Sequence, residues 1–168
     1  MSKEKRSTSI IKKLLRFFTL ISAVVILAVP VLFVLPNLAQ ITPYVVISES
    51  MEPSIPVGSI LYVGRCEPLE LKAGDVITFK MNQTTESTTT HRVVENDVEK
   101  RQLVTKGDAN EDVDIVKIPY LQVIGKVIWS VPKLGYALIY LNTDAGRMSY
   151  LAIFLLCIIS RFIADKID

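Results

Sequence analysis

The chain has 168 residues, of which half are hydrophobic, and its 19 Lys and Arg nearly balance its 17 Asp and Glu. The net charge of +2 is too small for a typical nucleic-acid-binding protein, so no nucleic-acid partner is expected. Two cysteines and a single histidine exclude both a disulfide-framed mini-protein and a zinc site built from protein ligands alone. The length accommodates one globular domain and one or two membrane-spanning segments.

The N-terminal region combines a basic flank with a long apolar run. Residues 1–16 carry six basic side chains against Glu4, and the next charged residue is Glu49. As a helix, the apolar run at 17–35 is about 28 Å long, close to the hydrocarbon thickness of a bilayer. Because cationic flanks resist translocation, we predict a cytoplasmic basic tail at 1–16 and an uncleaved transmembrane anchor at 17–38. A cleaved signal peptide is the alternative, although its apolar core is usually shorter.

A second uncharged segment lies near the C-terminus, at residues 148–160. This segment alone is too short to cross a bilayer, but it reaches sufficient length at residue 164 if Arg161 extends toward the interface. We therefore expect a second transmembrane helix at 148–164 and a cytoplasmic tail at 165–168, with a buried or interfacial helix as the alternative. The aromatic stretch before it, 134–143, fits either the membrane interface or ordinary core packing.

The segment between these two apolar regions, residues 39–147, is predicted to be an extracytoplasmic domain. Its apolar runs are short, rich in β-branched residues and separated by Gly and Pro turns, which is typical of an antiparallel β fold. The polar tract at 82–90 predicts a hairpin tip or loop. The expected fold class is thus mainly β, with an N-terminal and a C-terminal transmembrane helix. The runs expected to form strands are 44–47, 59–63, 75–81, 92–95, 102–105 and 123–129.

Three places in this domain carry residues suited to catalysis. Ser50 lies where a strand gives way to a turn before Pro53, His91 is the sole imidazole, and several carboxylates follow Gly107. Taken singly, they fit a turn serine, a structural histidine and a solvated acidic loop, and the loop lacks the full spacing of a calcium site. Taken together, they supply a nucleophile, a general base and an orienting acid. The carboxylates of the loop are Asp108, Glu111, Asp112 and Asp114.

Four short motifs and one further acid follow the N-terminal apolar segment in a fixed order. They are Ser50-Met51-Glu52-Pro53, Asp75-Val76-Ile77-Thr78-Phe79, His91-Arg92-Val93 and Lys106-Gly107-Asp108-Ala109-Asn110, with Asp114 four residues later. This series resembles the type I signal peptidases, and the resemblance covers nearly the whole chain. The histidine stands where the ordinary bacterial enzymes have a lysine. It therefore indicates the endoplasmic-reticulum-type branch, which occurs in eukaryotes, archaea and some Gram-positive bacteria.

The resemblance implies a role for each residue of the candidate site. Ser50 corresponds to the nucleophile and His91 to the general base. Two acids of the loop are candidates for orienting His91. Asp114 corresponds to the acid given this role here, and Asp108 corresponds to the acid of the Gly-Asp motif, for which holding the loop is the alternative role. The hydroxyl of Ser48 corresponds to the group that helps the Ser50 backbone N–H to form the oxyanion hole. No cofactor and no metal is implied.

The implied function is the removal of N-terminal signal peptides from exported preproteins after a small-x-small motif. Its implied partners are secretory preproteins, membrane lipid and the protein-export machinery, and its implied location is the cell membrane. A membrane-tethered adaptor that cuts nothing is the alternative from another class, and dedicated processing of pilins or biofilm proteins is an alternative task for the protease.

Two local features of the serine segment are left open by the sequence. Glu49 stands where the family often has glycine, so an anionic side chain lies next to the nucleophile in the chain. The chemistry tolerates this anion if it faces solvent, whereas an anion in the cleft disfavours an oxyanion. The apolar side chains of Met51, Ile55 and Val57 either pack in the core or enter the membrane interface.

Overall fold

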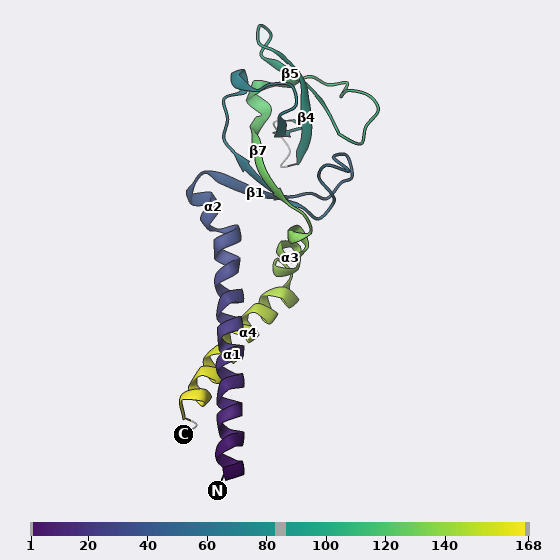
Figure 1. Ribbon diagram of the computed structural model, residues 1–168. Coiled ribbons are helices and arrows are strands. Elements are labelled where there is room, and N and C mark those ends of the chain that lie inside the picture. Colours follow the sequence, from purple (N-terminus) through teal and green to yellow (C-terminus); the bar gives the residue numbers. More distant parts are fainter. Residues whose placement is uncertain (1, 83–86, 167–168) are drawn as a thin grey trace. The chain divides into compact units, whose positions relative to one another are not determined.

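The computed structural model describes residues 2–82 and 87–166 (Figure 1). The chain divides into two compact units. The helical unit comprises Met1–Leu35 and Ile139–Asp168, and the β unit comprises Pro36–Leu138. The expected fold class, mainly antiparallel β with an apolar helix near each terminus, is confirmed.

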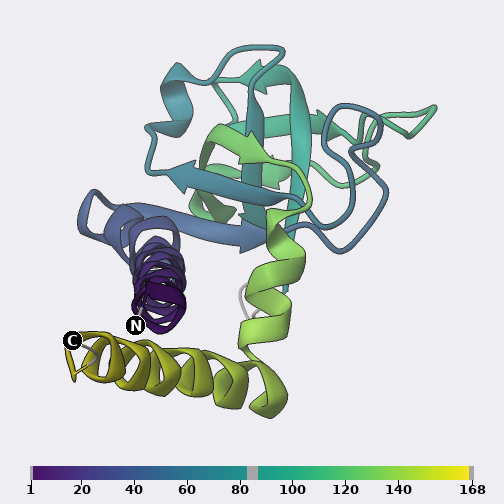
Figure 2. The same cartoon turned by 60° about the horizontal axis from the view of Figure 1, so that its bottom comes forward.

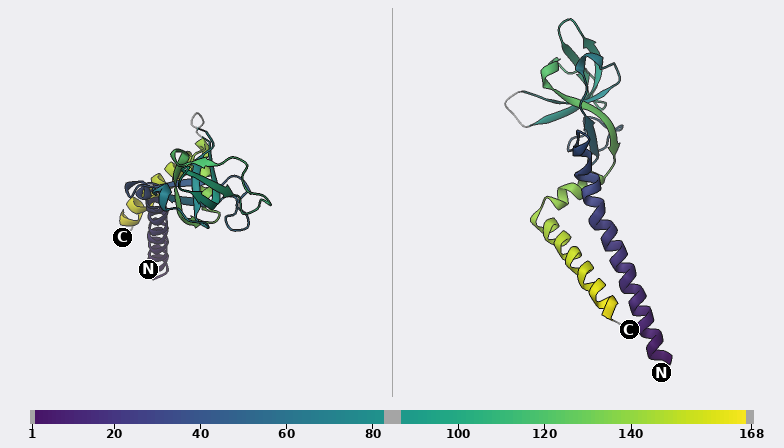
Figure 3. Two further views of the ribbon diagram at one scale, coloured as in Figure 1. Left: turned by 90° about the horizontal axis from the view of Figure 1, so that it is seen from above. Right: turned by 90° about the vertical axis from the view of Figure 1, so that its left-hand side faces the viewer.

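The helical unit consists mainly of two long helices, α1 (Ser2–Phe33) and α4 (Asp144–Lys166). They run side by side in opposite directions, as Figure 3 shows. Both are long and apolar enough to cross a membrane, over Ser9–Leu38 and Asp144–Lys166.

Hydroxyl groups join the two helices. Thr19 Oγ1 and Ser160 Oγ share a hydrogen bond of 2.8 Å, and the Tyr150 hydroxyl donates to the Ile26 carbonyl oxygen over 2.9 Å. The side chain of Ala164 in α4 is small and fully buried. Small residues allow a close approach of two helices, and polar contacts of this kind stabilise helix pairs in an apolar solvent.

The helix boundaries differ from the segments expected from hydropathy. α1 begins at Ser2, so the basic stretch expected as a tail at 1–16 continues the helix. Lys, Arg and Leu are good helix formers, which accounts for this extension. α4 begins four residues before the expected 148, because Thr143 Oγ1 accepts the Gly146 N–H over 3.0 Å and caps the helix. The aromatic stretch at 134–143 is mostly a short helix, α3 (Leu134–Leu141), and α2 (Leu35–Leu38) is shorter still.

The β unit is a curled seven-stranded sheet in which every pairing is antiparallel (Figure 2). The strand order is β1-β2-β7-β3-β4-β5-β6. Register shifts in the β2–β7, β3–β7 and β4–β5 pairs bend the sheet locally. The strands are β1 (Ile41–Val45), β2 (Ile60–Gly64), β3 (Val76–Lys80), β4 (Thr88–Asp97), β5 (Gln102–Lys106), β6 (Ile118–Pro119) and β7 (Val123–Val131).

Two hydrophobic clusters fill the β unit. The first gathers side chains from β3, β4, β5 and β6, and the second packs β2 against the turn that follows β1. The first cluster is Leu71, Ile77, Phe79, Val93, Leu103 and Ile118, and the second is Met51, Ile55, Leu61 and Val63. Met51 and Ile55 are therefore core residues, and the alternative that they enter a membrane interface is wrong for both.

The polar tract expected as a loop at 82–90 differs in part. Residues 83–86 lie outside the described residues. Thr88, Thr89 and Thr90 belong to β4 and pair with Lys80, Phe79 and Thr78 of β3. Threonine is β-branched and fits a pleated strand, so a polar composition here coexists with regular pairing.

Candidate active site

Ser50 lies on the turn that leaves β1, and buried neighbours hold this turn in place. The Met51 and Ile55 side chains are only 2% and 5% exposed, and the Ile55 N–H donates to the Met51 carbonyl over 2.8 Å. Ser50 itself is partly exposed, and its Oγ lies 3.5 Å from Ser48 Oγ. Glu49 is exposed to solvent, the orientation in which its charge is least disruptive. The turn thus presents two hydroxyls at the surface of the β unit.

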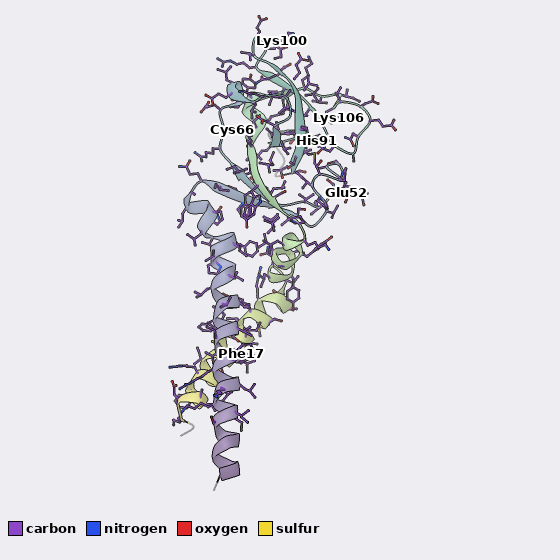
Figure 4. The ribbon with its side chains drawn as sticks, viewed as in Figure 1. Phe17, Glu52, Cys66, His91, Lys100 and Lys106 are labelled. Atoms are coloured by element: carbon purple, nitrogen blue, oxygen red, sulfur yellow. The ribbon has the colours of Figure 1, made fainter. Side chains whose placement is uncertain are left out.

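His91 lies on β4, opposite Ile77 of β3, and is only 8% exposed. Figure 4 shows His91 among the strands of the β unit, close to Lys106. Its Nδ1 lies 2.6 Å from Asp114 Oδ2, and its ring meets Phe79 edge-on with 6.2 Å between the ring centroids. The imidazole is therefore fixed by a carboxylate and by an aromatic neighbour.

Asp114 is itself fixed by Thr105, the penultimate residue of β5. The Thr105 hydroxyl donates to Asp114 Oδ2 over 2.6 Å, and the Asp114 N–H donates to the Thr105 carbonyl over 2.8 Å. One carboxylate oxygen thus serves both Thr105 and His91. With Asp114 ionised, Nδ1 carries the proton, which leaves Nε2 of a neutral His91 ring as the basic nitrogen.

Asp108 has a different partner, the Arg92 guanidinium next to His91 on β4. Arg92 donates from Nε over 2.8 Å and from Nη2 over 2.6 Å to the two carboxylate oxygens, and from Nη1 over 2.8 Å to the Gly74 carbonyl. These hydrogen bonds hold the pKa of Asp108 below its usual range and raise the pKa of Arg92. Two-point contact between these groups is the stronger, geometrically specific form of ion pair.

The acidic loop after β5 packs directly on the serine turn. The Ala109 N–H donates to the Ser50 carbonyl over 2.9 Å. A β-carbon at Gly107 would come within 2.6 Å of that same carbonyl oxygen, so only glycine allows this approach. The loop that carries Asp108 and Asp114 is therefore attached to the residue that carries the hydroxyl.

Ser50 and His91 line two different cavities. The smaller cavity, of about 90 Å³, runs from the end of β1 to Ser50 and Met51 and is closed on one side by the first residues of β4. The larger cavity, of about 620 Å³, is lined by His91 and Asp114. Thr89 is among the residues that line both cavities. Ser50 Oγ and His91 are both described, and no hydrogen bond joins them directly.

Metal ligation has no candidate within residues 2–82 and 87–166, where no three His, Cys, Asp or Glu side chains gather to hold a metal ion. Cys66 and Cys157 are both free thiols. Burial raises the pKa of the Cys66 thiol, which makes it a poor nucleophile at neutral pH.

The family described as signal peptidase, peptidase S26, matches residues 15–117. The chain belongs to this family. The matched segment contains Ser50, His91, Asp108 and Asp114, and it ends just before β6. Membership makes the chain a hydrolase of the signal-peptidase type.

Fungal proteins named signal peptidase complex catalytic subunit SEC11 are similar to the chain. The protein from Ogataea parapolymorpha is 30% identical over 132 residues, which cover 67% of this chain and 74% of the relative. Those from Zygosaccharomyces rouxii and Eremothecium gossypii are 37% and 38% identical over 111 residues, which cover 60% of this chain and 65% of each relative. The chain thus spans about two thirds to three quarters of these relatives.

Two residues of the site escaped the sequence analysis, Arg92 and Thr105. Arg92 lies within one of the four motifs, and its position before an acidic loop is a signal for an ion pair. Thr105 gave no such signal, because a threonine in a strand is ordinary. Only its complete burial together with its bond to Asp114 distinguishes it.

Proposed function

We propose that the chain removes signal peptides from secretory preproteins by a serine–histidine mechanism. Ser50 is the nucleophile, His91 the general base and Asp114 the acid that orients the imidazole. The observation that carries this proposal is the 2.6 Å contact between His91 Nδ1 and Asp114. It fixes the ring so that Nε2 is the nitrogen that exchanges a proton with Ser50.

In the first half of the reaction, Ser50 Oγ attacks the scissile carbonyl carbon while His91 takes the hydroxyl proton. The Ser50 N–H and the Ser48 hydroxyl donate to the oxyanion of the tetrahedral intermediate. Loss of one such donor typically lowers the rate by about 10²- to 10³-fold. His91 then gives the proton to the departing amine, and the carbon–nitrogen bond breaks to leave an acyl group on Ser50.

In the second half, water attacks the acyl carbon while His91 takes one of its protons. The ester bond to Ser50 Oγ then breaks, His91 gives the proton to Oγ, and the signal peptide leaves with a free carboxyl group. Both halves require Ser50 Oγ to come within hydrogen-bond reach of His91. In ligand-free enzymes this contact is often long and shortens when substrate binds. The proposed mechanism therefore requires Ser50 Oγ and His91 to approach each other when substrate binds.

The smaller cavity supports selectivity for small side chains next to the cleaved bond. Its volume of about 90 Å³ excludes large side chains. In an extended substrate, every second side chain faces the same side, so the residues at −1 and −3 share the same requirement. Within the described residues, β5 pairs with β4 only from Arg92 onward, so the β5 side of Thr88–Thr90 has no partner strand from β5. We propose that the substrate adds there as an extended strand.

We further propose that residues 17–38 and 148–164 anchor the enzyme in the cell membrane, with residues 1–16 and 165–168 in the cytoplasm and residues 39–147 outside. Two observations support this topology: both long helices have the length and apolar character to span a bilayer, and the basic flank precedes the first. Enzyme and substrate then share one membrane, which raises their effective concentration. We therefore propose membrane lipid and the protein-export machinery as partners of the enzyme.

The decisive experiment incubates the purified full-length protein with a preprotein that carries a small-x-small site and maps the new N-terminus. Cleavage at that site is expected, whereas Ser50→Ala and His91→Ala each abolish it. Ser130→Ala, which changes a serine of β7, is the matched control and retains activity.

Two results would contradict the proposal. Undiminished cleavage by Ser50→Ala would exclude this nucleophile and favour a tethered adaptor with a contaminating protease. Full activity of His91→Ala would exclude the imidazole as the base.

A further inference from the structure

The larger cavity beside His91 has no task in the mechanism above. Its volume of about 620 Å³ exceeds that of the cavity at Ser50 several-fold, and its walls come from β3, β4 and the loop between β5 and β6. Half of the residues that line it are apolar. Ile115 is fully exposed and Val116 is 62% exposed, although both are aliphatic. An exposed apolar rim around a cavity is a common feature of ligand sites.

The chemistry of the proposed reaction indicates which part of the substrate reaches this cavity. His91 must deliver its proton to the departing amine, so the amine nitrogen passes within hydrogen-bond reach of the imidazole. The acyl side of the substrate occupies the small cavity at Ser50. The residues that follow the cleaved bond therefore continue past His91, and the cavity that His91 lines is the larger one.

We propose that this larger cavity is a subsite for the mature segment of the preprotein, which takes a large apolar side chain just after the cleaved bond. This inference rests on the proposed function and adds a second specificity to it. The small side chains before the bond are chosen at Ser50, and an aliphatic or aromatic side chain after the bond is chosen beside His91.

The loop that forms the rim of the cavity is held in place and carries negative charge. Lys106 Nζ donates to the Glu111 carbonyl over 2.8 Å, and the Asp114 N–H is bonded to Thr105. Glu111 and Asp112 also line the cavity and are exposed. Their carboxylates repel an acidic side chain in the substrate, so the subsite discriminates against Asp and Glu as well as favouring large apolar residues.

The test uses two sets of preproteins that are identical up to the cleaved bond. One set varies the first mature residue among Phe, Leu, Ala and Asp, and the other varies the second. Full-length enzyme cleaves the members of a set in competition, which gives ratios of kcat/KM. Successive side chains of an extended segment face opposite sides, so only one of the two mature positions is expected to face the cavity. We therefore expect kcat/KM to vary with the side chain in only one of the two sets. In that set, Phe and Leu exceed Ala by about tenfold, and Asp is the poorest.

The double variant Ile115→Ser/Val116→Ser removes the apolar rim at two exposed positions, so the fold is expected to persist. Its preference for Phe over Ala is expected to fall toward unity. Leu121→Ser is the matched control, because Leu121 is 88% exposed and is absent from the residues that line the cavity. This control is expected to keep the preference of the wild type.

The outcomes separate the two proposals. If the wild type cleaves all substrates but responds to neither set, or if the double variant keeps the full preference, the subsite is excluded while the proposed function stands. If the wild type cleaves no substrate, the proposed function itself fails.

Discussion

The loop after β5 carries an aspartate near each end, Asp108 and Asp114, and the two aspartates contact different kinds of side chain. Asp108 makes a two-point ion pair with Arg92, a permanent cation, whereas Asp114 makes a single contact with the imidazole of His91. The first contact is suited to hold a loop in place at every pH of interest. The second is suited to orient a group that gains and loses a proton. Residue type alone does not assign a role here, because the role follows from the partner.

The partners differ because His91 and Arg92 are neighbours on β4. Successive side chains of a strand face opposite sides of the sheet. The loop after β5 therefore meets β4 twice, at Asp108 and at Asp114, on two different faces. If this interpretation is right, changes at the two ends of the loop separate activity from stability.

The largest effect is expected from Asp114→Asn. An amide leaves the shape nearly unchanged but does not hold the imidazole in the required tautomer. We expect kcat to fall by about 10³- to 10⁴-fold, while the thermal midpoint changes little. Steady-state cleavage and thermal unfolding, measured on the same preparation, test this. A large loss of stability with a small loss of kcat would reverse the roles given to the two aspartates.

Asp108→Asn is expected to show the complementary result. The variant loses charge-assisted hydrogen bonds to Arg92, so its free energy of unfolding is expected to fall by about 1.5–3 kcal/mol. Cleavage at a temperature where the variant remains folded is expected to suffer far less than in Asp114→Asn. Denaturant titration of both variants provides the comparison. Equal stability of the variant and the wild type would refute the anchoring role.

Acid unfolding sharpens the comparison further. Arg92 holds the pKa of Asp108 below its usual range, so the folded chain keeps this carboxyl ionised where the unfolded chain takes up a proton. The pair therefore contributes its full stability above about pH 4 and loses it as the pH falls through the lowered pKa. We expect the stability of the wild type to drop more steeply than that of Asp108→Asn between pH 5 and pH 2.

Asp75 is expected to make the stability of Asp108→Asn decrease with falling pH as well, although less steeply than that of the wild type. Burial acts to raise the pKa of Asp75, but hydrogen bonds from Lys126 and from the Lys72 N–H outweigh it and lower the pKa. Asp108→Asn retains this group, so its stability still declines in acid. Parallel curves for the two proteins would mean that Asp108 contributes nothing to acid stability.

The smallest effect is expected from Thr105→Val, which removes one of the hydrogen bonds to Asp114 and preserves the side-chain shape. A net hydrogen bond contributes about 0.5–1.5 kcal/mol, which corresponds to a decrease in kcat of about threefold to tenfold. Single-turnover cleavage resolves a change of this size. A decrease as large as that of Asp114→Asn would mean that Thr105 does more than fix the carboxylate.

The sequence anticipated the β architecture because its strands alternate with clear turn signals. The run at 102–105 corresponds closely to β5, and the run at 59–63 corresponds to β2. It did not anticipate β6, whose two residues carry no recognisable period. The pairing of β2 and β3 with β7 was also not predictable, because register between distant strands depends on the packed sheet.

The residues of the candidate site were predictable, and the pairing of Asp114 with His91 followed from the family resemblance alone. Ser50, His91 and the two aspartates stand in recognisable motifs, but both acids lie in one loop, and spacing alone left their partners undecided. The contacts to His91 and Arg92 depend on how the loop folds back on Thr105 and Ser50. Thr105 itself could not be found, because burial of a strand hydroxyl is a property of the folded core.

His91 and Arg92 are neighbours on β4, so a register error of this strand is expected to affect both side chains at once. A slip of β4 by a single position against β3 exchanges the faces on which the imidazole and the guanidinium lie, and with them the partners of both aspartates. On the proposed mechanism, such a misfolded molecule is expected to be inert, without any intermediate level of turnover. A partly damaged population is accordingly expected to behave as a mixture of fully competent and silent molecules, with an unchanged KM and a reduced active fraction.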